Sequence, residues 1–177
     1  MPTTYDPIAT QTLGSDSNFI TFNSIANTYT DLIVVVNGKS TTSGPASDCY
    51  VRLATGGGAI DTGNNYSTTR VQGDGSAAYS ARTTSQSLAQ AGGVPAGLAG
   101  ANDRGANIYH FMNYANTSTF KTFITRGNST ASNQSYGSAS LDVSLWRNTG
   151  AITSIQFITN GNYASGSVFT LYGIKAA

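Results

Sequence analysis

The segment SLDVSLWR at residues 140–147 alternates between small polar and apolar side chains from Ser140 to Leu145. Its leucines and its valine fall on one side of an extended chain, and its aspartate and serines fall on the other. A repeat of two residues is the period of a β-strand, because successive side chains point to opposite faces of a sheet. We therefore predict a strand here, and the same period recurs along the chain.

Other segments with strand character lie on both sides of this one, and none shows a convincing helical period. The run Leu32–Val36 is apolar at every position, which predicts a strand buried on both faces. Weaker candidates lie at Ser67–Gln72 and Tyr79–Ser87. The clearest of the others are Tyr5–Leu13, Phe19–Phe22, Cys49–Ala54, Asn107–Tyr114, Phe120–Arg126, Ile152–Thr159 and Val168–Ile174. About eight to ten strands separated by Gly, Asn and Ser clusters predict an all-β sandwich or barrel.

The composition supports the same fold class. Charged residues make up 10% of the 177 residues, against about 25% in ordinary domains. The sequence has no Glu and three Lys, so the residues that usually fill helices are scarce. The net charge of +1 gives no electrostatic attraction toward nucleic acid or an anionic membrane. We expect one domain over residues 1–177 and neither of those partners.

Two segments are expected to lie outside the sandwich. Residues 1–6 are read as an extended N-terminal arm, and they show neither the basic nor the apolar region of a signal peptide. Residues 88–106 are read as a long Ala/Gly-rich loop that carries Val94, Pro95 and Leu98. A loop of that length in a compact domain is usually functional or disordered. An interface loop and a merely flexible loop both fit this pattern.

Residues capable of catalysis are few. The single histidine, His110, lies within an apolar strand, and the single cysteine, Cys49, opens another. The chain has no G-x-S-x-G nucleophile elbow, and one His with one Cys cannot build a zinc site. Residues 61–65 faintly resemble a calcium loop, but turn chemistry explains them better. We expect no catalytic residue, no metal, no cofactor and no enzymatic activity.

Tyrosines are the most suggestive side chains in the connecting segments. Tyr66, Tyr79, Tyr136 and Tyr163 fall in or beside expected loops. Exposed aromatic rings can stack on sugars or anchor a protein interface. The same rings could instead pin the loops to the sandwich, and the sequence leaves both readings open.

Several stretches together resemble one family, the small structural domains of tailed bacteriophages, including cyanophages. The resemblance covers most of the chain except the Ala/Gly-rich segment, and its motifs are turn and strand patterns. The matching stretches are Tyr5–Leu13, Ile20–Ile25, Tyr29–Val35, Asn65–Ser67, Gly73–Gly75, His110–Asn116, Leu145–Arg147, Ile152–Phe157, Gly161–Tyr163 and Gly166–Ile174.

The resemblance implies a jelly-roll-like antiparallel sandwich that forms a homotrimer in a virion assembled in the host cytoplasm. Its first implied role is a capsid cement, or decoration, protein that binds the major capsid protein and stabilises the assembled head. The alternative is a tail-fibre or receptor-binding module that recognises host-surface glycans. The cement role is favoured because the chain starts directly in the domain and shows no fibrous shaft. The candidate partner-contact residues are Tyr5, Asp6, Val94, Pro95, Leu98, Tyr66 and Tyr163.

Overall fold

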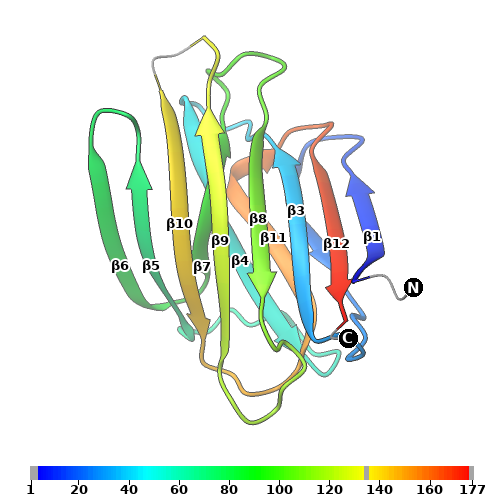
Figure 1. Cartoon of the computed structure of the whole chain (residues 1–177). Coiled ribbons are helices and arrows are strands. Elements are labelled where there is room, and N and C mark those ends of the chain that lie inside the picture. Colours follow the sequence, from blue (N-terminus) through cyan, green and yellow to red (C-terminus); the bar gives the residue numbers. More distant parts are fainter. Residues whose placement is uncertain (1–3, 134–135, 176–177) are drawn as a thin grey trace.

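The computed structural model describes residues 4–133 and 136–175, which form twelve strands and no helix (Figure 1). Eight strands make one sheet in the order β1-β12-β3-β8-β9-β10-β5-β6, and four make a second sheet in the order β2-β11-β4-β7. All neighbours are antiparallel. The predicted fold class, an all-β jelly-roll-like sandwich, is confirmed, with more strands than the eight to ten expected. Within the described ranges, no helix could cross a membrane.

The strand bounds are close to those expected from the sequence for most elements. The larger sheet contains β1 (Tyr5–Thr12), β3 (Asp31–Gly38), β5 (Tyr66–Gly73), β6 (Ala78–Gln86), β8 (Gly105–Phe111), β9 (Lys121–Thr130), β10 (Gly137–Trp146) and β12 (Val168–Ile174). The smaller sheet contains β2 (Ser17–Phe22), β4 (Ala46–Thr55), β7 (Ala89–Pro95) and β11 (Ile152–Tyr163).

Aromatic side chains join the two sheets at the centre of the core. Phe157 of β11 lies with its ring centroid 4.8 Å from that of Tyr109 on β8 and 5.8 Å from that of Phe169 on β12. The ring centroid of Phe22 on β2 lies 6.4 Å from that of Phe157. All four rings are buried. Fully burying such a side chain stabilises the fold by roughly 1.5–3 kcal/mol, so this group is a main source of stability.

A second anchor holds the end of β10 against the turn at Asp61. Trp146 stacks on Tyr66 with centroids 6.2 Å apart, and its indole N–H donates to the Asp61 carboxylate at 2.7 Å. The Tyr66 hydroxyl accepts the N–H of Leu53 and donates to the Asp61 carbonyl. Burial acts to raise the pKa of Asp61, but bonds from Trp146, Asn65 and Gly63 lower it below its usual range. The segment that faintly resembles a calcium loop is thus a hydrogen-bonded turn.

The expectation of a single long loop at residues 88–106 is wrong. Its first part is the strand β7, which pairs with β4 at the edge of the smaller sheet. The small residues reflect close packing: a Cβ on Gly92 would lie 2.2 Å from Oδ1 of Asn107, and Gly92 has φ +83°. Alanine and glycine therefore mark a tightly covered strand in this segment.

Two further expectations also need correction. Tyr5 and Asp6 belong to β1 and so are not part of a free arm, while residues 1–3 lie outside the described residues. The run Leu32–Val36 forms β3 as predicted, but it is not fully buried on both faces, because Val35 is 37% exposed. Nothing in the described chain covers the outer face of the larger sheet at Val35.

The close packing beneath β7 can be tested by a substitution at Gly105. A Cβ at this position would lie 2.6 Å from the carbonyl oxygen of Asn128 and 2.8 Å from Cδ of Pro95. Because backbone atoms cannot move aside easily, Gly105→Ala should lower the free energy of unfolding by about 1–3 kcal/mol. Urea unfolding measures this. Gly14→Ala is the control, because a Cβ there has no atom within 4 Å. Equal midpoints for the two variants would contradict the packing described.

Candidate functional site

The alternation of β10 is reversed relative to an ordinary half-buried strand. Asp142 and Ser144 point into the sandwich and are 0% exposed. Leu141 is 42% exposed and Val143 is 47% exposed on the outer face of the larger sheet. A strand on a sandwich normally places its apolar side toward the core. This reversal leaves apolar side chains on a surface that is open in the single chain.

Cross-strand neighbours extend this apolar surface over much of the larger sheet. Leu141 lies opposite Val71 of β5, and Val143 lies opposite Ile124 of β9. The strands that carry these residues lie side by side in the front layer of Figure 1. We call the following at least partly exposed residues the outer band: Val35, Val71, Ile108, Ile124, Leu141 and Val143.

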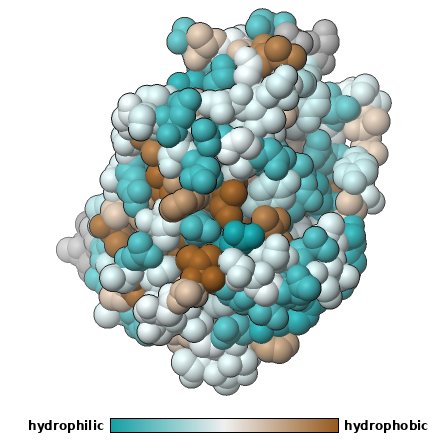
Figure 2. All heavy atoms as spheres, turned by 180° about the vertical axis from the view of Figure 1, so that it is seen from behind, coloured by the Kyte–Doolittle hydropathy of each residue, from teal (hydrophilic) through white to brown (hydrophobic). Residues whose placement is uncertain are grey.

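The opposite face of the molecule is different. Figure 2 shows apolar side chains there in separate clusters among polar ones. Among the large apolar residues exposed in the described chain, Phe19 belongs to the smaller sheet, whereas Val35, Val71, Leu141 and Val143 belong to the larger one. The two faces of the sandwich are therefore unequal, and the outer band lies on the more apolar one.

Cationic groups lie within and beside the outer band. Arg126 lies between Ile108 and Leu141 in one cross-strand row, and Arg82 lies on the edge strand β6. Both arginines are exposed, and the ion pairs among the described residues include neither. Arginine is common at interfaces because its planar guanidinium binds carboxylates with two parallel bonds. The band thus combines an apolar surface with unpaired positive charge.

His110 lies on this outer face, between Ile33 and Ile124 in the register. Its Nε2 is 2.9 Å from Oδ2 of Asp31, and Oδ1 of Asp31 accepts the N–H of Asn113. No serine, threonine or cysteine hydrogen-bonds to His110 in the described part of the chain. The His110–Asp31 pair therefore links the end of β8 to β3 and does not form a catalytic triad with a nucleophile.

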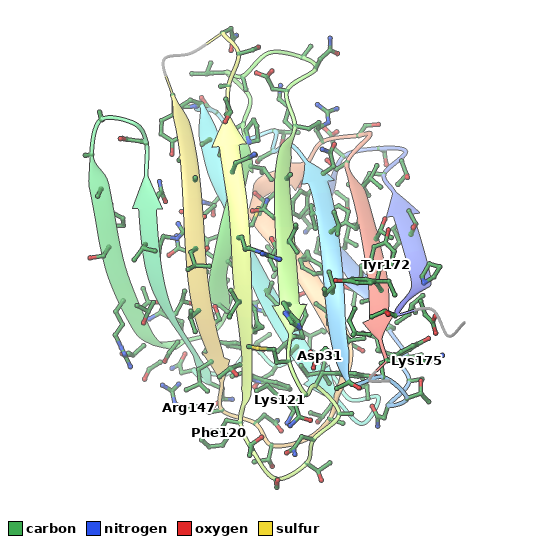
Figure 3. The ribbon with its side chains drawn as sticks, in the orientation of Figure 1. Asp31, Phe120, Lys121, Arg147, Tyr172 and Lys175 are labelled. Atoms are coloured by element: carbon green, nitrogen blue, oxygen red, sulfur yellow. The ribbon has the colours of Figure 1, made fainter. Side chains whose placement is uncertain are left out.

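Charged residues where β9 begins and β10 ends have structural roles. Figure 3 shows Phe120, Lys121 and Arg147 gathered where β9 begins and β10 ends. Lys121 is buried and donates to the carbonyl oxygens of Thr119 and Thr149, at 2.9 and 2.7 Å. Burial lowers the pKa of Lys121. Its bonds to two loop carbonyls explain why the ammonium group is buried there.

A buried ion pair lies on the inner side of β10. The guanidinium of Arg70 on β5 contacts both carboxylate oxygens of Asp142, with Nε to Oδ1 at 2.5 Å. It also donates to Asp48 at 2.8 Å and to the carbonyl of Gly92 at 3.0 Å. Burial acts to lower the pKa of Arg70, but the two aspartates outweigh it and raise that pKa above its usual value. Arg70 therefore connects the two sheets through charged hydrogen bonds.

A polar cavity of about 140 Å³ adjoins this ion pair. Its lining includes Asp48, Arg70 and Gln72, with hydroxyl groups from β4, β9 and β10. The described residues hold no cluster of three or more His, Cys, Asp or Glu that could bind a metal. The sequence showed no signal for this cavity, because Arg70, Asp142 and Asp48 are far apart along the chain.

The residues expected to contact a partner do not share one surface. Tyr5 and Leu98 are exposed, while Asp6 pairs with Lys175 at 2.5 Å. The other four are buried, so the interpretation of them as contact residues is wrong in this fold: they are Val94, Pro95, Tyr66 and Tyr163.

The buried tyrosines have a structural role instead. Tyr66 is held by Trp146, and Tyr163 packs edge-on against Phe169 and donates to the carbonyl of Ile158. The rings pin loops to the core, which is one of the two roles open at the level of sequence. Residues of the outer band were missed as contacts. The sequence did offer one indication of this surface. The run that forms β3 is apolar at every position, which indicates that the outer face of this strand is covered as well as the inner one.

Comparison with known proteins gives little similarity. No protein-family model matches the sequence, and no curated protein matches it. Among solved structures, the β-fructofuranosidase from Schwanniomyces occidentalis complexed with fructosyl-erythritol has a TM-score of 0.27 and 7% identity. That alignment covers 99% of this chain and 35% of the other, so the chain spans about a third of that protein. A likeness this low carries no argument about function.

The ion pair can be tested by removing its positive member. Arg70→Met leaves the carboxylate of Asp142 buried without its counter-charge, which should lower the free energy of unfolding by about 3–5 kcal/mol. The double variant Arg70→Met/Asp142→Leu should recover part of that loss, because no buried charge remains but the N–H of Gly92 loses its acceptor on Asp142. Guanidinium unfolding measures both. A single variant as stable as the parent would show that Arg70 does not stabilise the sheet contact.

Cys49 provides a test of core rigidity. Burial raises the pKa of its thiol from 9.0 to about 12, and the hydroxyls of Tyr109 and Tyr163 lie beside it. At pH 8 the native protein should not react with a disulfide reagent such as DTNB, and denaturant should expose one thiol. Since the folded pKa is raised, this group's stability contribution is complete below pH 9 and is lost as the pH rises toward 12. Rapid labelling of the native protein would contradict this burial.

Proposed function

We propose that this protein is a non-enzymatic structural module that joins a larger assembly through the outer band. The observation that carries the proposal is the reversed β10, where Asp142 is buried while Leu141 and Val143 face outward. Contiguous apolar surface on a monomer commonly marks an interaction site. A partner that covered the band would also bury the outer side of β3, as its fully apolar sequence predicts.

The chemistry of the band indicates the kind of partner. Its side chains are aliphatic, with the exposed Arg126 between Ile108 and Leu141 and the exposed Arg82 at the edge strand. An apolar protein surface with carboxylates would complement both features. Two copies facing each other through the band about a two-fold axis would bring like charges close together. The band therefore favours a different protein, or a different face of this one, as its occupant.

Within this class, we propose a capsid cement protein of a bacteriophage head, as a homotrimer whose bands contact the major capsid protein. A trimer joins two different patches of neighbouring subunits, so it does not need the band to pair with itself. Binding to the assembled shell stabilises that shell by mass action. The low charge and the small neutral side chains of the chain suit broad protein contact. The family resemblance of the sequence supports this role.

The other role, a tail-fibre module that reads host glycans through loop tyrosines, has less support. Two of the tyrosines in question, Tyr66 and Tyr163, are buried in the core. The number of copies per virion separates the roles. A cement protein is present in many copies over the head, whereas a tail module is present in few, and quantitative mass spectrometry of purified particles measures this.

A double substitution in the band tests the proposed interface. Leu141→Ser/Val143→Ser removes exposed apolar side chains, so the free energy of unfolding should change by only about 0.5 kcal/mol for each. Because burying an aliphatic side chain contributes roughly 1.5–3 kcal/mol, replacing two of them by serine should weaken binding to isolated heads at least about tenfold. Co-sedimentation with heads that lack the protein measures occupancy.

The matched control is Phe19→Ser, which removes an exposed aromatic ring from the smaller sheet on the other face. It should leave occupancy unchanged. Full occupancy by the double variant, or equal loss in the control, would reject the outer band as the docking surface.

A further inference from the structure

The polar cavity lies between the sheets at one end of the sandwich. Figure 1 shows β5 and β9 running toward this end and β10 starting from it. Its inner wall is buried, and its rim is half-buried or exposed. The cavity is lined by Ala46, Ser47, Asp48, Arg70, Gln72, Gly92, Gly93, Asn128, Ser129, Tyr136, Ser138 and Ser140.

The charge of the cavity excludes an anionic ligand. Arg70 is its positive group, and Asp142 and Asp48 already bind the guanidinium. Two carboxylates against one guanidinium leave the site with a net charge of −1. An anion would therefore meet repulsion without a free cationic partner. A metal ion would find too few carboxylates, since Asp48 is the one aspartate in the lining.

A buried hydroxyl in the wall supplies an independent observation. Ser129 is 2% exposed, and its Oγ has no hydrogen-bond partner among the described residues. Buried hydroxyl groups are normally paired, because leaving one unpaired costs free energy. Ser129 lines the cavity, but its Oγ is closed to solvent, so a polar ligand would become its partner only after rotation of the side chain about the Cα–Cβ bond.

The rest of the lining offers neutral hydrogen-bonding groups and an aromatic ring. The rim carries the amides of Gln72 and Asn128 and the hydroxyls of Ser138 and Ser140. Tyr136 adds a half-buried ring, whose hydroxyl lies 3.4 Å from Oγ of Ser138. Hydroxyls, amides and an aromatic ring around one carboxylate match a polyhydroxylated neutral molecule, which can both donate and accept at many positions.

The size of the cavity suits a single ring. An engineered cavity of about 150 Å³ in another protein holds benzene. The space here, about 140 Å³, is comparable, and since a hexose has twice as many non-hydrogen atoms as benzene, part of the sugar would extend through the open rim. We propose that this cavity is a binding site for one neutral sugar unit, such as the terminal hexose of a glycan. The site is separate from the outer band, so the inference does not depend on the proposed assembly role.

Saturation-transfer NMR on the whole chain tests the site directly. The probes are D-glucose, D-galactose, D-mannose and N-acetyl-D-glucosamine, with N-acetylneuraminic acid as an anionic probe and ethylammonium as a cationic one. At least one neutral sugar should give a signal that competes with the others, and neither charged probe should. Ser129→Ala should weaken that sugar about two- to tenfold, the range expected for one hydrogen bond. Ser138→Phe should abolish binding, because the ring occupies the half-buried rim.

Thr125→Val is the matched control. Thr125 also lies on β9, and its hydroxyl is buried and unpaired among the described residues, but it does not line the cavity. This variant should bind like the parent, and one-dimensional spectra check that every variant is folded. The proposal is overturned if no neutral sugar gives a signal, or if Ser129→Ala and Ser138→Phe both bind like the parent. It is also overturned if a charged probe binds better than every sugar.

Discussion

The ion pair between Arg70 and Asp142, together with the buried Trp146 on the same side of the strand, determines which way β10 faces. Asp142 is fully buried against the guanidinium of Arg70, which also holds Asp48 and the carbonyl of Gly92 across the gap between the sheets. Successive residues of a strand point to opposite faces, so Leu141 must point outward once Asp142 points inward. A shift of one residue would bury Leu141 but leave Arg70 without its partner. The outer band is therefore a direct consequence of a polar contact in the interior.

This constraint divides the sandwich into two parts with different interiors. One part is filled by aromatic rings around Phe157 and provides the apolar core. The other lies beneath β5, β9 and β10 and holds the ion pair, the hydrogen bond between Thr68 and Ser144, and the polar cavity. Polar interiors bury less apolar surface, so this part is expected to contribute less to stability. It carries instead the two features with a proposed function: the cavity inside and the outer band outside.

Sequence periodicity was most reliable where a strand packs on the apolar core. The strands β8, β11 and β12 lie close to their predicted positions because their alternation reflects one covered face, and β3 was found from its continuous apolar run. It failed at β7, where the glycines and alanines that suggest a loop are required by close contact with Asn107 and its neighbours. It also failed for Tyr66 and Tyr163, which are the first residue of β5 and the last residue of β11 and face the core from these strand ends.

The sequence by itself determined the class of the protein. Scarce helix formers, period-two alternation and frequent turn residues leave an antiparallel β-sandwich, and one His with one Cys and no Glu leave few groups for catalysis. Only the tertiary structure decided which side of each strand is inside. The alternation from Ser140 to Leu145 is the same whichever face is buried. The choice depends on the contact of Asp142 with Arg70, 72 positions away in the chain, and on the burial of Trp146 against Tyr66. Pairwise contacts between distant residues leave no local signal, so the outer band and the cavity became visible only in the folded chain.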